Sequence, residues 1–211
     1  MTQAHSHGHD DHVHRPLTRY EKLERALREL LVENGLLTEV EIATEVDAMY
    51  ARTPARGQQV IARAWFDPGF KARLLADGAA ALRELGIDAG GLKLVVVENA
   101  PAVHNLIVCT LCSCYPVMLL GRSPDWYKSI AYRSRAVREP RTVLAEFGTH
   151  LPAGVTVRVH DSTADMRYMV LPMRPAGTEH LTEAECGALV SRDDMIGVTV
   201  PKSPPLASAV E

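Results

Sequence analysis

The stretch "VCTLCSCYP", residues 108–116, places three cysteines within six positions. Only Ser113 separates Cys112 from Cys114, and Cys109 lies three residues before Cys112. The apolar run "NLIVC" at 105–109 leads directly into them and is typical of a buried strand. The sequence thus predicts a strand that ends in a short loop carrying three thiols, and the rest of the fold has to hold that loop.

The segment before this loop is predicted to be mainly helical. Apolar residues recur at helical spacing after Thr18, which forms a capping-box signature with Glu21. Asp67 followed by a proline is a further start signal. These signals predict helices over 17–35, 38–51 and 67–86, and the β-branched run "LKLVVVE" predicts a strand over 92–98.

Beyond the loop, helices and strands alternate. Pro124 and Pro140 bound one helical stretch, and Thr182 with Glu185 caps another, whereas "VTVRVHDS" alternates with a period of two. The predicted elements are helices over 124–140 and 181–191 and strands over 155–162, 166–172 and 196–201. The predicted fold class is therefore α+β, with N-terminal helices followed by a mixed α/β layered core that carries the cysteine loop.

The two ends of the chain differ in composition from its centre. Residues 1–16 are polar and rich in histidine, which predicts a disordered tail that binds metal only incidentally. No convincing linker divides the remainder, so 17–203 is predicted to be one domain with an N-terminal helical arm. Residues 204–211 are predicted to be a flexible C-terminus.

Composition excludes several classes of function. Of 211 residues, 46 % are hydrophobic and 23 % are charged, as in ordinary globular proteins. The net charge of −3 gives no basic surface for nucleic acid. The apolar runs are too short for a membrane helix, and the N-terminus lacks the apolar core of a secretory signal. We therefore expect a cytoplasmic protein with no nucleic-acid or membrane partner.

Three thiols this close have more than one possible use. Cys109 and Cys112 have the spacing of a redox pair, but a third thiol and a proline follow at once. Structural zinc needs four ligands, usually in two separated pairs. His104 could add the fourth, although a lone histidine beside a strand is more often structural. Cys186 is predicted to be a small buried residue of a helix.

A metal that also binds the backbone fits the spacing better. If the amides of Ser113 and Cys114 lose their protons, both nitrogens can close small chelate rings with the neighbouring sulfurs. Two sulfurs and two nitrogens can then form a nearly planar set, which Cys109 caps from one side. The opposite face stays open, as a catalytic metal requires. Thiolates with anionic amides suit trivalent iron or cobalt better than zinc.

Several motifs together resemble one enzyme family. The segments "VCTLCSCYP", "PDWYKSIAYRSRAVREPR" and "RYMVLPMRPAGTE" are similar to segments of the α subunit of nitrile hydratases. The helical segment 60–86 and the stretch 189–201 are similar as well. The resemblance runs in collinear order through 17–201, and the cysteine core is its most specific part. It implies hydration of a nitrile to the amide at a metal centre.

The resemblance assigns roles to the loop residues. It implies that Cys109, Cys112 and Cys114 are thiolate ligands and that the amides of Ser113 and Cys114 are nitrogen ligands. In the family, the residue matching Cys112 is a sulfinic acid and the residue matching Cys114 is a sulfenic acid, and these two act in catalysis with Ser113. Thr110 matches the cobalt-type pattern. The implied cofactor is therefore non-corrin cobalt(III), with iron(III) as the alternative.

The resemblance also implies partners. In the family, two arginines of a β subunit hold the oxidised sulfurs, and the motif places no arginine of this chain to do so. The implied partners are a β-type subunit, as one chain or as two shorter ones, a metallochaperone or activator that loads cobalt, and the nitrile substrate.

Residues outside the cysteines give two further expectations. Val117 stands where family members carry a tryptophan beside the open metal face, and Met118 replaces a proline. We expect a wider pocket that takes a bulky, heteroaromatic or nucleoside-like nitrile, unless a partner side chain refills the space. Four other residues are expected to lie either beside the metal or at a subunit interface, where the charged ones would form salt bridges at the strand ends. They are Thr110, Asp161, Asp165 and Arg167.

Two other functions stay open. The catalytic subunit of thiocyanate hydrolase carries the same cysteine motif, although Tyr115 and Pro116 match the nitrile hydratase form better. A metallochaperone or metal-binding regulator would account for the His-rich tail together with the cysteines, and it would release its metal readily to a chelator.

Overall fold

Residues 16–204 are described in the computed structural model of this chain. The His-rich tail and the C-terminus predicted to be flexible fall almost wholly outside these residues. The chain divides into two compact units, Met1–Asp47 and Ala48–Glu211. Within residues 16–204, no helix is long and apolar enough to cross a membrane.

The first unit contains α1 (Arg19–Glu33) and most of α2 (Glu39–Tyr50). The Thr18 side chain accepts a hydrogen bond from the Glu21 amide, and the Glu21 carboxylate accepts one from the Thr18 amide, so the predicted capping box is confirmed. None of the residues of α1 is buried. The helix forms as its spacing predicts, but its apolar stripe stays exposed.

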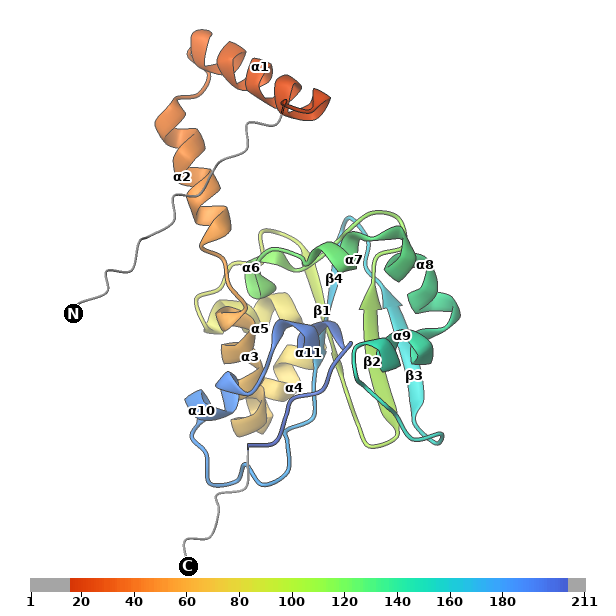
Figure 1. Ribbon diagram of the computed structural model, residues 1–211. Helices are drawn as coiled ribbons and strands as arrows, with labels where there is room; N and C mark the ends of the chain where they lie inside the picture. The colour runs from red at the N-terminus through yellow and green to blue at the C-terminus, as the bar shows by residue number, and fades with distance from the viewer. Residues whose placement is uncertain (1–15, 205–211) are drawn as a thin grey trace, which may run out of the picture. The chain divides into compact units, whose positions relative to one another are not determined.

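The second unit packs helices around two short parallel sheets, which confirms the predicted α+β class (Figure 1). Its strands are β1 (Lys93–Glu98), β2 (Val103–Val108), β3 (Thr156–Asp161) and β4 (Met166–Leu171). Its helices are α3 (Ala55–Phe66), α4 (Pro68–Ala76), α5 (Gly78–Glu84), α6 (Val117–Leu120), α7 (Asp125–Lys128), α8 (Ile130–Arg138), α9 (Pro140–Glu146), α10 (Glu183–Ala188) and α11 (Arg192–Ile196).

Parallel pairing brings strand ends that are distant in sequence to the same place. β1 pairs with β4, and β2 pairs with β3. In the second pair Val108 lies opposite Asp161, so both strands end side by side. Helices α4 and α5 contact β1, α8 contacts β2, and α9 contacts β3. Because β2 is buried from His104 to Val108, the cysteine loop begins at a fixed point.

The single helix predicted over 67–86 is wrong, because two helices occupy this stretch. At Asp77 the backbone is extended, with φ −148° and ψ 93°, and its side chain accepts a hydrogen bond from the Ala80 amide. A Cβ atom on Gly78 would lie 2.7 Å from the carbonyl oxygen of Leu94. Glycine therefore lets α5 begin directly against β1, and the aspartate caps it.

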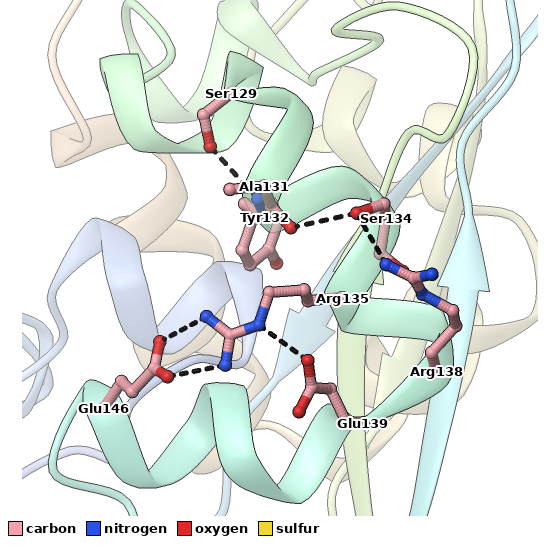
Figure 2. A network of polar contacts seen from close by, with 8 residues as sticks. All are labelled: Ser129, Ala131, Tyr132, Ser134, Arg135, Arg138, Glu139 and Glu146. Carbon is pink, nitrogen blue, oxygen red and sulfur yellow. Dashed lines mark hydrogen bonds and ion pairs between the residues drawn. The ribbon is translucent and has the colours of Figure 1, made fainter.

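The helix predicted over 124–140 is also interrupted. Ser129 has an extended backbone, and its hydroxyl accepts a hydrogen bond from the Tyr132 amide, so α7 ends and α8 begins there (Figure 2). Pro140 does not end helical structure, because it is the first residue of α9. Arg135 of α8 contacts Glu139 and forms two hydrogen bonds to Glu146 of α9, which joins the two helices (Figure 2).

The closing strand predicted over 196–201 is absent from the described fold. A capping box of Ser191 and Asp194 starts α11 instead, and Gly197 then turns the chain with φ +89°. The carbonyl of Val198 accepts a hydrogen bond from the Thr149 hydroxyl. Ile196 and Val198 are buried without pairing in a sheet, whereas Val200 is exposed.

Gly197 should be the glycine whose replacement is most damaging to stability. A Cβ atom there would lie 2.1 Å from the carbonyl oxygen of Asn105, in a backbone conformation that already disfavours side chains. We expect Gly197→Ala to lower the free energy of unfolding by roughly 3–5 kcal/mol, measured by urea denaturation. Gly148 has a similar φ of +82° but open space around its Cβ position, so Gly148→Ala should cost only about 1–2 kcal/mol. Equal losses of unfolding free energy in the two variants would contradict a steric clash at Gly197.

Candidate metal centre

The three cysteines of the loop converge as their spacing predicts. Cys109 follows the last residue of β2 and is fully buried. The sulfurs of Cys109, Cys112 and Cys114 all lie within 4.8 Å of one another. Cys112 Sγ is 3.5 Å from Cys109 Sγ and 3.3 Å from Cys114 Sγ, too far for a disulfide. Three sulfurs so placed can bind one metal ion.

The two sides of the cluster differ in exposure. Cys109 and Cys114 are buried, whereas Cys112 and Ser113 are exposed. Leu111, at the tip of the loop, is 86 % exposed. A metal held by these sulfurs would therefore be covered by protein on the side of Cys109 and Cys114 and accessible on the side of Cys112.

Neighbouring groups of the loop act on the exposed sulfur of Cys112. Hydrogen bonds with the Cys114 and Cys109 side chains lower the pKa of Cys112 to about 7, and the backbone amides of Ser113 and Cys114 add to this effect. Burial raises the pKa of Cys114 to about 12, with Cys112 as the next cause. Cys112 therefore ionises more readily than Cys114.

Asp161 secures the first turn of the loop. The Thr110 amide donates to Asp161 Oδ1 at 2.9 Å, and the Thr110 hydroxyl donates to Oδ2 at 2.5 Å. Arg133 Nη1 lies 3.4 Å from the Thr110 carbonyl oxygen. Asp161 can reach Thr110 because strand pairing places it opposite Val108.

The other two residues grouped with Asp161 behave differently. Arg167 Nη1 donates to the carbonyl oxygens of Thr163 and Ala164, and its charge acts to lower the pKa of the Cys114 thiol against the effect of burial. Asp165 is exposed, and its carbonyl accepts from the Lys93 amide. Among the described residues, no ion pair joins these three side chains to one another, and the salt bridges expected at a subunit interface stay a prediction.

Val117 and Met118 begin α6, directly after Pro116. Both side chains are half-buried and pack against the hydrophobic core. They follow the loop closely in sequence, and whether they line a substrate pocket stays a prediction.

The remaining candidates for a zinc site lie apart from the cluster. His104 Nε2 is 2.7 Å from the Gly197 carbonyl oxygen, and its other ring nitrogen faces the Asn99 amide, so its role is structural. Burial lowers the pKa of His104, which keeps the ring neutral. Cys186 is fully buried in α10, as predicted. Within the described part of the chain, no fourth histidine, cysteine or carboxylate ligand joins the three sulfurs.

Sequence reasoning missed two tyrosines that contact the loop's backbone. The Tyr127 hydroxyl donates to the Cys114 carbonyl at 2.9 Å, and the Tyr132 hydroxyl donates to the Ile107 carbonyl at 2.6 Å. Their spacing gave no signal, because the interruption at Ser129 changes the direction in which α8 presents its side chains. The available signal was the residue type, because a buried tyrosine hydroxyl usually needs a hydrogen-bond partner.

The acidity of Cys112 gives a pH-dependent reaction rate. The thiolate is the reactive form, and with a pKa near 7 its fraction rises with pH and is half-maximal there. In the metal-free protein we expect alkylation of Cys112 by iodoacetamide to have its midpoint near pH 7, measured by peptide mass spectrometry. Cys114 should react slowly up to pH 9. A Cys112 midpoint near pH 9 would contradict the arrangement of donors around its sulfur.

An α+β chain with three thiols converging on a strand-end loop belongs to the class of metal-binding proteins, and comparison with known proteins narrows this class. The family model described as nitrile hydratase, alpha chain, matches residues 18–199. The chain therefore belongs to the nitrile hydratase α-chain family, and it is an enzyme subunit.

Three relatives illustrate the match. The low-molecular weight cobalt-containing nitrile hydratase subunit alpha of Rhodococcus rhodochrous is 49 % identical over 185 residues, covering 85 % of this chain and 88 % of that protein. Thiocyanate hydrolase subunit gamma of Thiobacillus thioparus is 41 % identical over 195 residues, covering 87 % and 80 %. A double mutant of the Fe-type nitrile hydratase from Comamonas testosteroni Ni1 superposes with a TM-score of 0.83 at 43 % identity, covering 90 % of this chain and 98 % of that one.

Proposed function

We propose that this chain is the catalytic, metal-bearing subunit of a nitrile hydratase, which adds water to a nitrile and yields the amide. The observation that carries the proposal is the convergence of the Cys109, Cys112 and Cys114 sulfurs on one loop. Family membership and the relatives named as cobalt-containing nitrile hydratase subunits support it.

The donor atoms fit a trivalent cobalt ion. Three sulfurs are within reach of one ion, and the Ser113 and Cys114 amides lie close enough to Cys112 to affect its pKa. We infer that these five groups would hold cobalt(III), because Thr110 matches the cobalt-type pattern and cobalt-containing relatives are similar to this chain. When bound, the ion would supply Lewis-acid chemistry for nitrile hydration.

The exposed half of the loop is where the chain's own groups would act. Ser113 is exposed and next to Cys112 in the sequence, and we propose that its hydroxyl donates a hydrogen bond to the substrate or to an oxidised sulfur. We propose that Cys112 becomes a sulfinic acid and Cys114 a sulfenic acid in the mature enzyme. The low pKa of Cys112 supports its deeper oxidation, since thiolates oxidise first.

A β-type partner is proposed to complete the site. Oxidised sulfurs need cationic donors, and no arginine of the described chain donates a hydrogen bond to the Cys112 or Cys114 sulfur. The exposed Leu111 and the uncovered apolar stripe of α1 are surfaces that such a subunit would cover. The partner can be one chain or two shorter ones, and a metallochaperone is proposed to load the cobalt.

The proposed function can be tested by metal analysis with a matched control. Cys109 and Cys186 are both fully buried, so Cys109→Ala and Cys186→Ala remove the same side chain from equally buried positions. After co-expression with a β-type subunit and cobalt, we expect about one cobalt per chain and conversion of nitrile to amide in the wild type and Cys186→Ala. Cys109→Ala should lose both.

Mass analysis of the loop peptide in the same preparation should find two oxygens on Cys112 and one on Cys114. Stoichiometric zinc, or full cobalt occupancy in Cys109→Ala, would contradict the proposal.

A bulky nitrile is the proposed substrate class. Val117 presents a short aliphatic side chain where the family has an indole, and Met118 can adjust its shape beside it. We expect Val117→Trp to reverse a preference for a fused-ring heteroaromatic nitrile over a small aliphatic one, with metal content and sulfur oxidation unchanged. The ratio of the two kcat/KM values should move by at least about tenfold. An unchanged ratio would mean that valine in place of the family's tryptophan changes only local packing and not substrate preference.

Thiocyanate hydrolysis is the second candidate, favoured by the 41 % identity to a thiocyanate hydrolase subunit. The purified heteromer distinguishes the two when thiocyanate and a panel of nitriles are supplied separately. Consumption of thiocyanate with no amide formed from any nitrile would assign the alternative.

A further inference from the structure

Two buried tyrosines anchor the backbone on either side of the cysteine cluster. Tyr132 donates its hydroxyl to the carbonyl of Ile107, near the end of β2, and Tyr127 donates to the carbonyl of Cys114, after the last thiol. Tyr127 is fully buried and Tyr132 is 6 % exposed. Both carbonyls therefore have a hydrogen-bond partner where water is excluded. Breaking either bond would leave a buried polar group without a partner, which costs free energy.

Ser162 connects the end of β2 to the surroundings of Tyr127. The Ser162 amide donates to the Val108 carbonyl at 2.7 Å. Burial raises the pKa of Tyr127, and the Ser162 side chain acts against that effect, so it lies near the Tyr127 hydroxyl.

The separation between the two anchors is fixed by ring packing. The Tyr127 and Tyr132 ring centroids are 5.7 Å apart, and Trp126 packs edge-on against Tyr132 with centroids 4.9 Å apart. The Ser129 hydroxyl caps α8 at the Tyr132 amide, which sets the direction of that ring (Figure 2). The link from Arg135 to Glu146 then holds α8 against α9 (Figure 2).

We propose that Tyr127 and Tyr132 are positioning residues that hold the two ends of the cysteine loop, so that the three sulfurs converge before a metal arrives. Neither touches a sulfur, and each acts through a backbone carbonyl. The consequence for cobalt uptake rests on the function proposed above, whereas the ordering of the loop does not.

The chain offers a matched control at Tyr115. Its ring belongs to the same aromatic group, with its centroid 5.2 Å from that of Tyr127. Its hydroxyl is buried and has no hydrogen-bond partner among the described residues. Tyr115→Phe therefore removes the same atom from the same environment without removing a bond to the loop.

The first measurement needs no metal. In the metal-free full chain, we expect Tyr127→Phe to accelerate alkylation of Cys114 roughly tenfold, because loss of one hydroxyl bond to a buried carbonyl eases opening of the loop end. Tyr132→Phe should act at the other end and accelerate alkylation of Cys109. Tyr115→Phe should leave both rates at the wild-type value. Circular dichroism and thermal unfolding would show that the variants are folded.

The second measurement is anaerobic titration of the same proteins with Co²⁺, followed through thiolate-to-metal absorption. Tyr127→Phe and Tyr132→Phe should weaken apparent binding roughly tenfold, and Tyr115→Phe should not. If all three variants match the wild type in alkylation, the positioning role is wrong. If the wild type binds no cobalt, the proposed function fails, and the alkylation rates still decide the role of the tyrosines.

Discussion

The parallel pairing of β2 with β3 is the constraint on which the metal loop depends. It places Asp161 opposite Val108, and from there the carboxylate reaches both polar groups of Thr110. Parallel neighbours need a long crossover, and residues 109–155 supply it. This crossover contains the cysteines, α6 and the aromatic helices. The crossover therefore carries both the loop and the two tyrosines that hold its ends, whereas Asp161 holds it from the end of β3.

Three sulfurs within 4.8 Å cannot all be thiolates without a counter-charge. Two unit charges about 4 Å apart interact by roughly 4 kcal/mol at the effective dielectric of a protein surface. The metal-free cluster avoids this repulsion by holding its negative charge on Cys112, while burial keeps Cys114 protonated. A bound cation would reverse that balance, so metal uptake should release protons and depend on pH.

Local patterns predicted much of this arrangement, and long-range contacts decided the rest. The strand before Cys109, the capping boxes at Thr18 and Thr182, and the convergence of the cysteines follow from spacing alone. The interruptions at Asp77 and Ser129 do not, because each depends on a neighbour distant in sequence or on a cap inside an otherwise helical pattern.

The apolar residues after Gly197 show the same limit. Their pattern predicts a strand, but the chain turns at Gly197, whose carbonyl oxygen lies 2.7 Å from His104 Nε2, and they form no strand. The contact between Asp161 and Thr110 likewise needed the strand register, which the sequence does not display. The sequence therefore predicted the three convergent thiols of the candidate centre, but not most of the groups that hold their loop.

The two tyrosines that hold the backbone on either side of the cysteines are neutral donors, and this has a consequence for what the cluster can bind. The carbonyls of Ile107 and Cys114 receive tyrosine hydroxyls, and burial raises the pKa of both tyrosines so that they stay neutral donors. The arginines near the loop, Arg133 and Arg167, are only half-buried and bond to backbone carbonyls.

No cation of the described chain therefore pairs directly with the buried sulfurs of Cys109 and Cys114. Burial raises the pKa of the Cys114 thiol, so its ionisation is unfavourable until a positive charge is placed beside it. A metal ion held by the loop is the charge that fits this position, since the surrounding protein provides order and leaves the neutralisation of the thiolates to the ion.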